Sequence, residues 1–396
     1  TLLQKAPSKR QSTEHYKAMQ TLERSFFPNT WRNTKEAIQT KGDKPMKSGR
    51  TLQELAIEID RQAKTKRDYL VETPALRMVP ENSRFNLSID GLDDLLNINN
   101  VAHRQIGTQL GIPAKYYDKM RTEYPQLLVE NVNGWWLQKE PERRMIRTLD
   151  GTARAYLSDK YRRIDNLEVA ETVLPIIGNM DGATIESCEL TDYRMYIKVV
   201  NQRITAEVKK GDIVQAGIMI TNSETGQGSV SVSPLIYRLV CSNGMIATDN
   251  SLRKYHVGRV NAADDNFGIY RDETIEADDR AFLMKIEDTV RAAVDQAQFE
   301  QIVRRMRDAT EAKMETSTVP KVIKLISKEY SISQEEGNGI LGHLIQGGDL
   351  SLYGLANAVT RFSQDIKDYD RATELEATGW KVLTMAPSTW KQVNAV

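Results

Sequence analysis

Hydrophobic and polar positions recur with different periods along the chain, and the changes of period predict its elements. Residues 1–50 are polar and basic with little periodicity, so we interpret them as an arm, weakly helical around residues 15–27. Residues 51–68 carry apolar side chains three and four positions apart, a spacing that predicts one helix with Thr51 as its N-cap.

Residues 69–150 mix helical and strand patterns. Two helices are predicted over 99–110 and 113–124, joined by a Gly-Ile-Pro turn. The strand-like run 143–149 ends at an Asp-Gly dipeptide, which is a strong signal for a hairpin between apolar runs. We therefore expect residues 152–158 to pair with that strand.

The middle of the chain is rich in strand patterns. Its clearest alternation places Tyr193, Met195, Ile197 and Val199 on one face. A predicted helix over 165–178 precedes these strands. The strands expected are 184–191, 193–201, 212–224 and 228–243, followed by one long amphipathic helix over 277–313 and a helical remainder with Gly-rich connectors at 337–348.

Together these patterns predict an α+β fold with a central antiparallel β-sheet backed by helices. A small mixed module precedes the sheet, and a helical C-terminal domain follows it. The expected units are 1–70 (basic arm and helix), 71–150 (small mixed α/β module), 151–315 (central sheet plus long helix) and 316–396 (helical domain).

Length and composition are those of a globular protein with more than one domain. The 396 residues are enough for two or three cores, and 27% charged residues is an ordinary proportion. No apolar run is long enough for a membrane helix, and the first residues lack the apolar region of a signal peptide. Cys188 and Cys241 are the only cysteines, so we expect a reducing cytoplasm and no disulfide framework.

The net charge of zero conceals a segregation of charge. Residues 1–70 hold 15 basic and 8 acidic residues, and residues 139–163 hold 8 and 4. Residues 261–300 reverse the balance, with 4 basic and 11 acidic residues. A neutral chain of this kind can present a basic groove and an acidic face that meets a basic face on a neighbouring subunit.

Basic and aromatic residues are interleaved most densely in the run RAYLSDKYRRIDN, at the turn from a predicted strand to a predicted helix. Cations neutralise phosphates, and aromatic rings stack on unpaired bases, so this pattern is typical of a single-strand-binding groove. Three such clusters flank the predicted sheet. The candidate nucleic-acid-binding residues are Trp136, Lys139, Arg143, Arg144, Arg147, Arg154, Tyr156, Lys160, Tyr161, Arg162, Arg163, Arg253, Lys254, Tyr255 and Arg259.

No motif in the chain indicates an enzyme, a metal or a cofactor. The P-loop, H-E-x-x-H and G-x-S-x-G patterns are absent, and the four histidines have no ligand spacing. A G-x-G-x-x-G match at 337–342 has helical patterns on both sides, so we interpret it as a loop between helices rather than a dinucleotide site. The carboxylates Asp159, Asp165 and Asp249 have no spacing that singles them out for Mg²⁺.

Two further motifs leave alternatives open. Residues 102–120 resemble a helix-turn-helix whose second helix carries Lys115, Tyr116 and Tyr117, and the alternative is a packing hairpin that supports the core. The run Ser242-Asn243-Gly244 offers backbone amides to a phosphate, or it is a simple turn with positive φ at Asn243 and Gly244.

The runs YLSDKYRRIDN, RLVCSNGM and LYGLANAVTRFSQDIKDYDRATELEATG resemble a phage- and plasmid-borne family known only as domain of unknown function 932. The likeness covers about residues 75–385 and implies a prokaryotic mobile-element setting. A second resemblance rests on the order of elements. A helix, several antiparallel strands and a long helix are similar to the core of the single-strand annealing proteins, which include the RecT-, Redβ- and Erf-type and Rad52-like annealers.

That second resemblance implies rings or filaments that hold single-stranded DNA in a basic groove without ATP. We therefore expect a non-enzymatic, single-stranded DNA-binding and strand-annealing protein of recombination. Its expected partners are single-stranded DNA, further copies of itself and possible helper proteins such as an exonuclease or a single-strand-binding protein. The alternatives are a duplex-DNA-binding regulator or replication factor that uses residues 102–120, and an anti-defence or structural protein-interaction factor.

Overall fold

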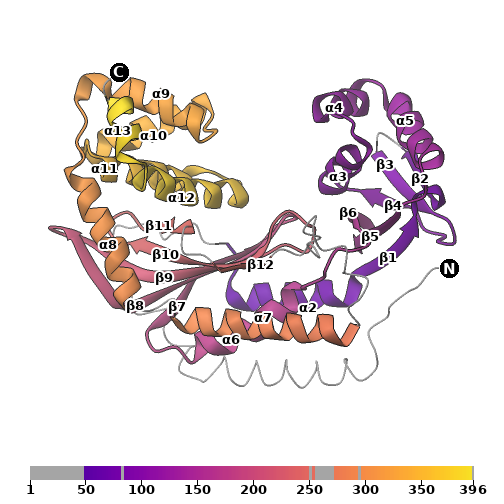
Figure 1. Ribbon diagram of the computed structural model, residues 1–396, viewed down its shortest axis with the longest axis horizontal. Coiled ribbons are helices and arrows are strands. Elements are labelled where there is room, and N and C mark those ends of the chain that lie inside the picture. Colours follow the sequence, from indigo (N-terminus) through magenta and orange to yellow (C-terminus); the bar gives the residue numbers. More distant parts are fainter. Residues whose placement is uncertain (1–48, 82–83, 249–251, 255–271, 293–295, 395–396) are drawn as a thin grey trace.

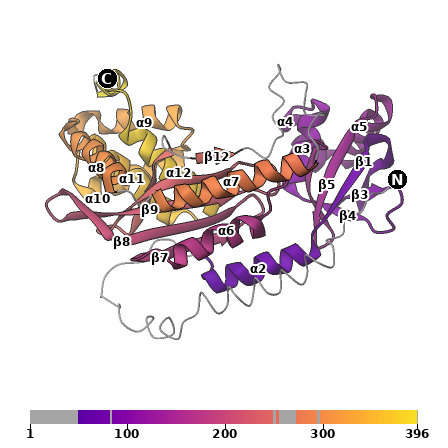
Figure 2. The same cartoon turned by 60° about the horizontal axis from the view of Figure 1, so that its bottom comes forward.

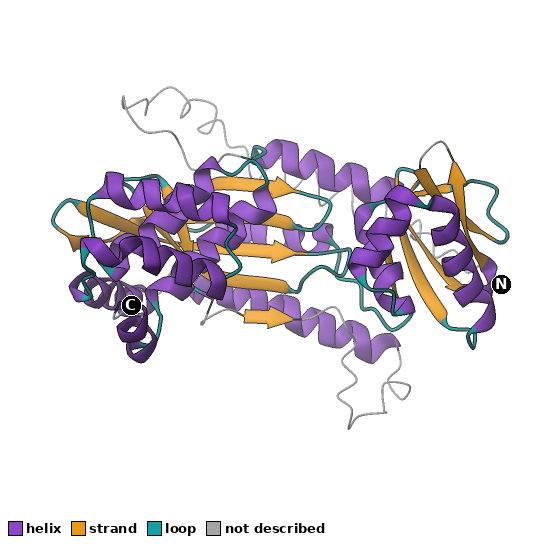
Figure 3. Ribbon diagram, turned by 90° about the horizontal axis from the view of Figure 1, so that it is seen from above, coloured by secondary structure: helices purple, strands orange, loops and turns teal. Residues whose placement is uncertain are grey.

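The computed structural model describes residues 49–81, 84–248, 252–254, 272–292 and 296–394. It contains two β-sheets and a C-terminal group of helices (Figure 1). Seen from above, the strands of the central sheet lie between the C-terminal helices at one end and an N-terminal module at the other (Figure 3). The predicted α+β class is therefore confirmed.

The N-terminal module is a six-stranded sheet preceded by helix α2 (Leu52–Thr65). Thr51 caps α2 in a capping box with Glu54, as its position before the apolar run predicted. The strands have the order β1-β5-β6-β4-β3-β2, in which only β4 and β6 are parallel. Their bounds are β1 (Arg67–Glu72), β2 (Leu76–Glu81), β3 (Arg84–Ile89), β4 (Leu96–Ile98), β5 (Arg143–Leu149) and β6 (Thr152–Ser158).

Three helices complete this module: α3 (Asn100–Leu110), α4 (Ala114–Glu123) and α5 (Pro125–Gln138). The apolar faces of α3 and α5 pack on the sheet in one core. The predicted hairpin of β5 and β6 turns at Asp150-Gly151, and both of these residues have positive φ. This hairpin crosses the boundary expected at residue 150, so the N-terminal sheet extends from β1 to β6 as one unit.

The central sheet has the strand order β11-β10-β9-β8-β7, and β12 pairs with β10. Helices α2, α6 (Asn166–Gly178) and α7 (Asp272–Ala292) cover one face of it (Figures 1 and 2). The four predicted strands exist as β7 (Ala183–Leu190), β8 (Met195–Lys209), β9 (Asp212–Asn222) and β10 (Val230–Arg238), although β10 ends at Arg238 and not at residue 243. Two short strands that were not predicted follow, β11 (Asn243–Ile246) and β12 (Leu252–Lys254).

The single helix predicted over 277–313 is wrong. The structure forms α7 and α8 (Gln296–Glu311), which run in different directions in Figure 1. Helix α7 stays on the helix-covered face of the central sheet, whereas α8 packs with the C-terminal helices. The two helices therefore belong to different cores.

The C-terminal helices lie over the opposite face of the central sheet (Figure 1). A fully buried ion pair, Lys198 Nζ to Glu376 Oε2 at 2.6 Å, joins β8 to these helices. Burial alone would lower the pKa of Lys198, but the Glu376 carboxylate outweighs it and raises that pKa. The helices are α9 (Val319–Glu329), α10 (Gln334–Gly347), α11 (Leu352–Phe362), α12 (Tyr369–Leu383) and α13 (Pro387–Asn394).

The G-x-G-x-x-G match lies inside helix α10, so the loop predicted there is wrong. A Cβ atom at Gly339 would come within 2.1 Å of the Phe362 ring, whereas one at Gly342 would meet nothing within 4 Å. The first of these glycines allows α10 to approach the ring closely, and the motif forms no phosphate-binding turn.

Candidate nucleic-acid interface

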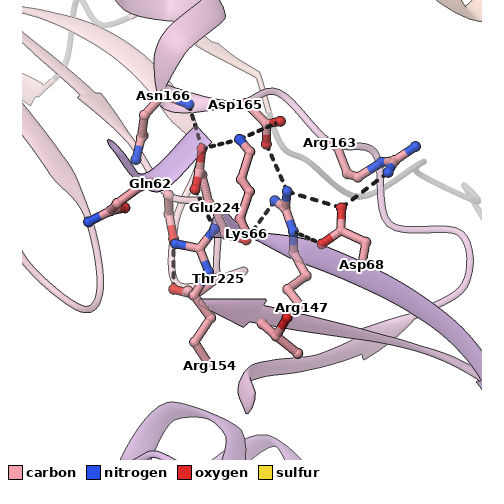
Figure 4. Close-up of polar contacts among 12 residues, drawn as sticks. Gln62, Lys66, Asp68, Arg147, Arg154, Arg163, Asp165, Asn166, Glu224 and Thr225 are labelled. Atoms are coloured by element: carbon pink, nitrogen blue, oxygen red, sulfur yellow. Dashed lines mark hydrogen bonds and ion pairs between the residues drawn. The ribbon is translucent and has the colours of Figure 1, made fainter. Parts of the chain in front are cut away.

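Three of the arginines predicted to bind nucleic acid, Arg147, Arg154 and Arg163, lie at the junction where the two sheets meet (Figure 4). We define the junction network by the charged residues gathered there. It contains four cations from the C-cap of α2, β5, β6 and the turn before α6, and three carboxylates from β1, the N-cap of α6 and the loop after β9. These residues are Lys66, Arg147, Arg154 and Arg163, with Asp68, Asp165 and Glu224.

Arg147 is the centre of the junction network and is fully buried. Its Nε lies 2.8 Å from Asp68 Oδ1, and its Nη2 lies 2.8 Å from Asp165 Oδ1. Its Nη1 donates to the backbone carbonyl oxygen of Glu224 at 3.0 Å. One guanidinium therefore holds together a strand of the N-terminal sheet, the start of α6 and the loop that follows β9.

Glu224 is the most buried carboxylate of the network, with 4% of its surface exposed. Its Oε2 lies 2.5 Å from Arg154 Nη2, and its Oε1 lies 3.2 Å from Lys66 Nζ. The backbone N–H of Asn166 also donates to Oε1, at 2.7 Å. Each carboxylate oxygen thus has a charged partner, as burial of an ion requires.

The pKa values of the network carboxylates follow from these contacts. Burial by itself raises the pKa of Asp165, but Arg147 and Lys66 outweigh it and hold the pKa far below the ordinary value. The pKa of Glu224 is also lowered, because Arg154, Lys66 and Arg147 together outweigh its burial and the nearby charge of Asp165. Asp165 and Glu224 are therefore ionised at neutral pH, and they neutralise part of the positive charge at the junction.

Two more of the predicted arginines are also paired with carboxylates. Arg144 bonds to Glu142, and Arg162 Nη1 lies 2.8 Å from Asp278 Oδ2 on α7. Arg163 is partly exposed, but its Nη1 lies 3.1 Å from Asp68 Oδ2. Their neighbours in the folded chain include acidic residues far away in sequence, which the local pattern did not reveal.

Three of the aromatic residues predicted to stack on bases, Trp136, Tyr156 and Tyr161, are buried. Tyr156 packs against Trp136 with ring centroids 6.1 Å apart, and Trp136 is 1% exposed. Tyr161 donates from its hydroxyl to the carbonyl oxygen of Ser223 at 3.0 Å. Burial raises the pKa of Tyr161 above its ordinary value. These three rings build cores and present no face to a base in this conformation.

Three of the predicted cations remain on the surface. Lys139 follows α5, Arg143 begins β5, and Lys160 lies in the turn after β6. Within the described part of the chain, Arg143 and Lys160 belong to no ion pair. Arg253 and Lys254 lie in β12, of which only the backbone is described. Tyr255 and Arg259 lie outside the described residues.

An exposed aromatic surface lies instead on the helical hairpin of α4 and α5. Trp135 is 44% exposed, and Lys139 Nζ lies 5.5 Å from the centroid of its ring. The same hairpin exposes Tyr116 and Tyr124, and Lys115 is exposed beside Tyr116. We call these residues (Lys115, Tyr116, Tyr124, Trp135 and Lys139) the hairpin surface. It combines rings for stacking with cations for phosphate.

The sequence pattern indicated Trp136 as the candidate ring and missed its neighbour Trp135, because the two residues were interpreted as an extended segment and not as part of a helix. Trp135 lies in the last turn of α5, and Lys139 is the C-cap residue four positions further along, with its Nζ over the Trp135 ring. Trp136 turns toward the sheet and joins the core of the N-terminal module. The helical spacing of the tryptophan and the lysine was the signal that could have identified the exposed ring.

Helices α3 and α4 pack tightly, as the interpretation of a supporting hairpin required. His103 Nδ1 and the hydroxyl of Tyr117 lie 2.8 Å apart in the core. A Cβ at Gly107 would come within 2.9 Å of the Tyr117 ring, so the glycine permits this approach. Burial is the main cause that lowers the pKa of His103 to about 3, and Arg121 adds to it. Tyr117 is therefore a core residue, whereas Lys115 and Tyr116 face outward.

The run Ser242-Asn243-Gly244 leads from a turn into strand β11, and only Ser242 lies in the turn. The positive φ lies at Ser242, at 48°, and not at the two residues expected to have it. Asn243 is buried, and its Nδ2 donates to Thr360 Oγ1 at 2.5 Å. This side chain therefore serves a contact between β11 and α11.

The described residues contain no group of three or more His, Cys, Asp or Glu side chains placed to hold a metal ion. Asp165 belongs to the junction network, Asp159 is exposed in a turn, and Asp249 lies outside the described residues. No helix that the structure describes has the length and apolar character needed to cross a bilayer.

The fold is thus an α+β arrangement of two sheets and a helical unit, with an ion network between the sheets. A family described as Domain of unknown function (DUF932) matches residues 155–388, which is more than half of the chain. The protein belongs to this family, as the resemblance predicted. The match includes the central sheet and most of the C-terminal helices, and it begins after the hairpin surface. No curated protein and no solved structure matches the chain.

Proposed function

We propose that this protein is an ATP-independent, single-stranded DNA-binding and strand-annealing protein of a phage or mobile element. It would act in the bacterial cytoplasm as a ring or filament. The observation that carries the proposal is the hairpin surface, where Trp135 is exposed with the Lys139 ammonium above its ring. An exposed ring with cations nearby fits a strand whose bases are unpaired.

The physical mechanism requires no covalent chemistry. Stacking of one base on an aromatic ring contributes about 1–3 kcal/mol and tolerates any sequence. Lysines near the ring neutralise phosphates and release counterions. A strand held by its backbone and by ring faces keeps its base edges open to pairing. Repetition of such short sites along an oligomer would hold a long strand extended for a complementary strand to test.

The order of elements in the central unit gives a second line of support. Helix α6 precedes the strands β7 to β10, which form an antiparallel meander, and α7 returns to lie beside α6 on the same face. This is the order on which the resemblance to annealing proteins rests. It supports the proposal at the level of topology only, because a fold by itself does not determine a function.

The first experiment measures binding of fluorescent single-stranded and duplex oligonucleotides of equal length across a salt series. We expect preference for single strands, affinity that falls steeply with salt, and rings or filaments in electron micrographs of the same samples. A strand-pairing assay without ATP then tests annealing. Absence of binding at about 0.1 M salt, near physiological ionic strength, would contradict the proposal and favour a protein-interaction factor.

The salt dependence of the affinity for DNA also tests whether Lys139 contacts a phosphate. Lys139→Ala should reduce the slope of log affinity against log salt by about 1, because one phosphate contact is lost. Lys324→Ala is the matched control, since this lysine is exposed on α9 in the C-terminal unit. Equal slopes for the wild type and both variants would exclude Lys139 from the interface.

Duplex recognition is the second candidate, and one observation favours it. Helix α4 follows α3 after a left-handed Gly111 turn and exposes Lys115 and Tyr116, as the reading helix of a helix-turn-helix would. This alternative predicts a sequence preference on duplex DNA that persists at higher salt. Tighter binding of duplex than of single strands would favour it over annealing.

A further inference from the structure

An open groove lies between α6 and α7, in the layer of helices that covers one face of the central sheet. Its volume is about 460 Å³, and its apolar lining consists of Pro175 and Ile176 from α6 and Leu283 and Met284 from α7. Met284 is 63% exposed, although large apolar side chains are usually covered. In the same layer, Ile57 on α2 is 60% exposed (Figure 2). The outer face of the layer therefore offers apolar surface of the kind that marks interaction sites.

The charged side chains of the groove favour neither a basic nor an acidic partner. They are two of each sign: Arg280, Glu287 and Arg291 on α7, and Glu171 on α6. Along α7 the charges and Met284 are spaced by three or four positions, so they form one stripe of the helix. From the N-terminal end the stripe is positive, apolar, negative and positive. A sequence of this kind is complementary to a copy of itself that runs in the opposite direction.

The register of such a pairing follows from the positions along the stripe. Positions 280 and 287 lie equally far from a two-fold axis placed between positions 283 and 284 of α7. In an antiparallel pair about this axis, Arg280 of each copy lies opposite Glu287 of the other, and Met284 packs beside the axis. Within the described part of the chain Arg280 belongs to no ion pair, and Glu287 pairs with Arg291 at 3.4 Å. One contact would therefore cover the apolar lining and give Arg280 a carboxylate.

The face formed by α6 and α7 is large enough for a stable contact. Helix α7 has 21 residues, so it is about 31 Å long at 1.5 Å per residue. With α6 beside it, the face is about 20 Å wide, because one helix is about 10 Å across. The product is about 600 Å² on each copy. Two such faces reach about 1,200 Å², the lower limit for specific interfaces.

We propose that two copies of this protein pack through the α6–α7 face, with their α7 helices antiparallel about a two-fold axis beside Met284. The proposal does not depend on DNA binding, because the hairpin surface lies on the N-terminal module. A two-fold contact closes on itself, so rings or filaments would use other surfaces in addition.

Disulfide trapping in the full chain, without DNA, tests the contact. Met284→Cys should form a disulfide between the two copies of position 284 on mild oxidation, identified by peptide mapping so that Cys188 and Cys241 do not confuse the result. Ile345→Cys is the control, because Ile345 is 65% exposed on α10 of the C-terminal unit. We expect a yield at least tenfold higher for Met284→Cys. Equal yields for the two variants would overturn the proposal.

A charge swap tests the register. In the Met284→Cys background, Arg280→Glu and Glu287→Arg should each reduce the disulfide yield severalfold, because each places like charges opposite one another. Both substitutions in one chain should restore the yield. An equal mixture of the two singly swapped chains, one of them ¹⁵N-labelled, should also restore it through disulfides between unlike chains. Failure of either combination to restore the yield would overturn the antiparallel pairing.

Discussion

The junction network and the hairpin surface both contain cations, but in opposite surroundings. At the junction the cations meet carboxylates, and Arg147 is fully buried. On the α4–α5 hairpin, Trp135 is exposed and Lys139 lies over its ring. The first region uses its charges to join two sheets, and the second leaves its charges available to a ligand.

A cluster of basic residues in the sequence therefore does not by itself give a basic surface in the folded protein. The partners of the junction arginines come from distant segments: Asp68 lies 79 residues before Arg147, and Glu224 lies 70 residues after Arg154. Local sequence shows the cations, and only the fold brings the carboxylates to them. A binding surface is better identified by cations that the fold leaves without acidic neighbours.

The largest effect expected from this comparison is on stability at the junction. Arg147→Met leaves Asp68 and Asp165 without their central cation in a buried place, so we expect a loss of about 3–5 kcal/mol in the free energy of unfolding. Chemical denaturation measures it. Arg143→Met, on the same strand but exposed, is the control and should change stability by less than about 0.5 kcal/mol.

One outcome would contradict this distinction between a structural network and a binding surface. If Arg147→Met kept full stability and lost affinity for DNA, Arg147 would belong to a binding surface and not to a structural network. We expect Arg147→Met to lose stability and to keep its affinity for DNA, and we expect variants of the hairpin surface to keep normal stability.

The next effect is on pH dependence and concerns the core beneath the hairpin surface. The folded-state pKa of His103 is about 3, below its ordinary value near 6.5, so between these values only the unfolded chain binds the proton. Stability should therefore fall by about 1.4 kcal/mol for each pH unit as the pH drops from 6.5 toward 4. Unfolding free energies measured across this range test the prediction.

His103→Gln should remove that slope, because it removes the titrating group. Asp165 and Glu224 of the junction network have lowered pKa values, so their contribution is complete above about pH 4 and is lost only as the pH falls further. An unchanged slope in His103→Gln would show that another group titrates there.

The smallest expected effects on stability concern Gly339 and Gly342, two glycines of the G-x-G-x-x-G match in α10 that differ in their surroundings. Gly339→Ala places a Cβ against the Phe362 ring and should cost about 1–3 kcal/mol of stability. Gly342→Ala meets open space within the same helix and should stabilise the protein by about 0.5–1 kcal/mol. Thermal unfolding of both variants measures the difference. Equal effects would mean that the contact with Phe362 does not constrain α10.

Much of the fold could be predicted because its signals are local. Thr51 and the Asp150-Gly151 turn indicate an N-cap and a hairpin by themselves, and the alternation along β8 marks a strand. The division of 277–313 into two helices could not be predicted. Helix-forming residues continue through it without glycine or proline, and the two halves separate because they join different cores.

Less of the candidate site than of the fold could be predicted from the sequence. Burial of Trp136 and exposure of Trp135 depend on which side of α5 meets the sheet, and this follows from packing with β2 and α3. The pairing of Arg162 with Asp278 depends on α7 returning beside α6. Both are properties of tertiary structure, so the pattern of charges alone assigned the wrong rings to the surface.

The most direct test of the central claim is the affinity of Trp135→Ala for single-stranded DNA at fixed salt. Tyr193→Ala is the matched control, because Tyr193 is 41% exposed on the central sheet's β7–β8 turn. The account predicts a loss of about 1–3 kcal/mol for Trp135→Ala, a factor of roughly 5 to 150, with Tyr193→Ala binding as the wild type does. Wild-type affinity in Trp135→Ala, or equal losses in both variants, would contradict it.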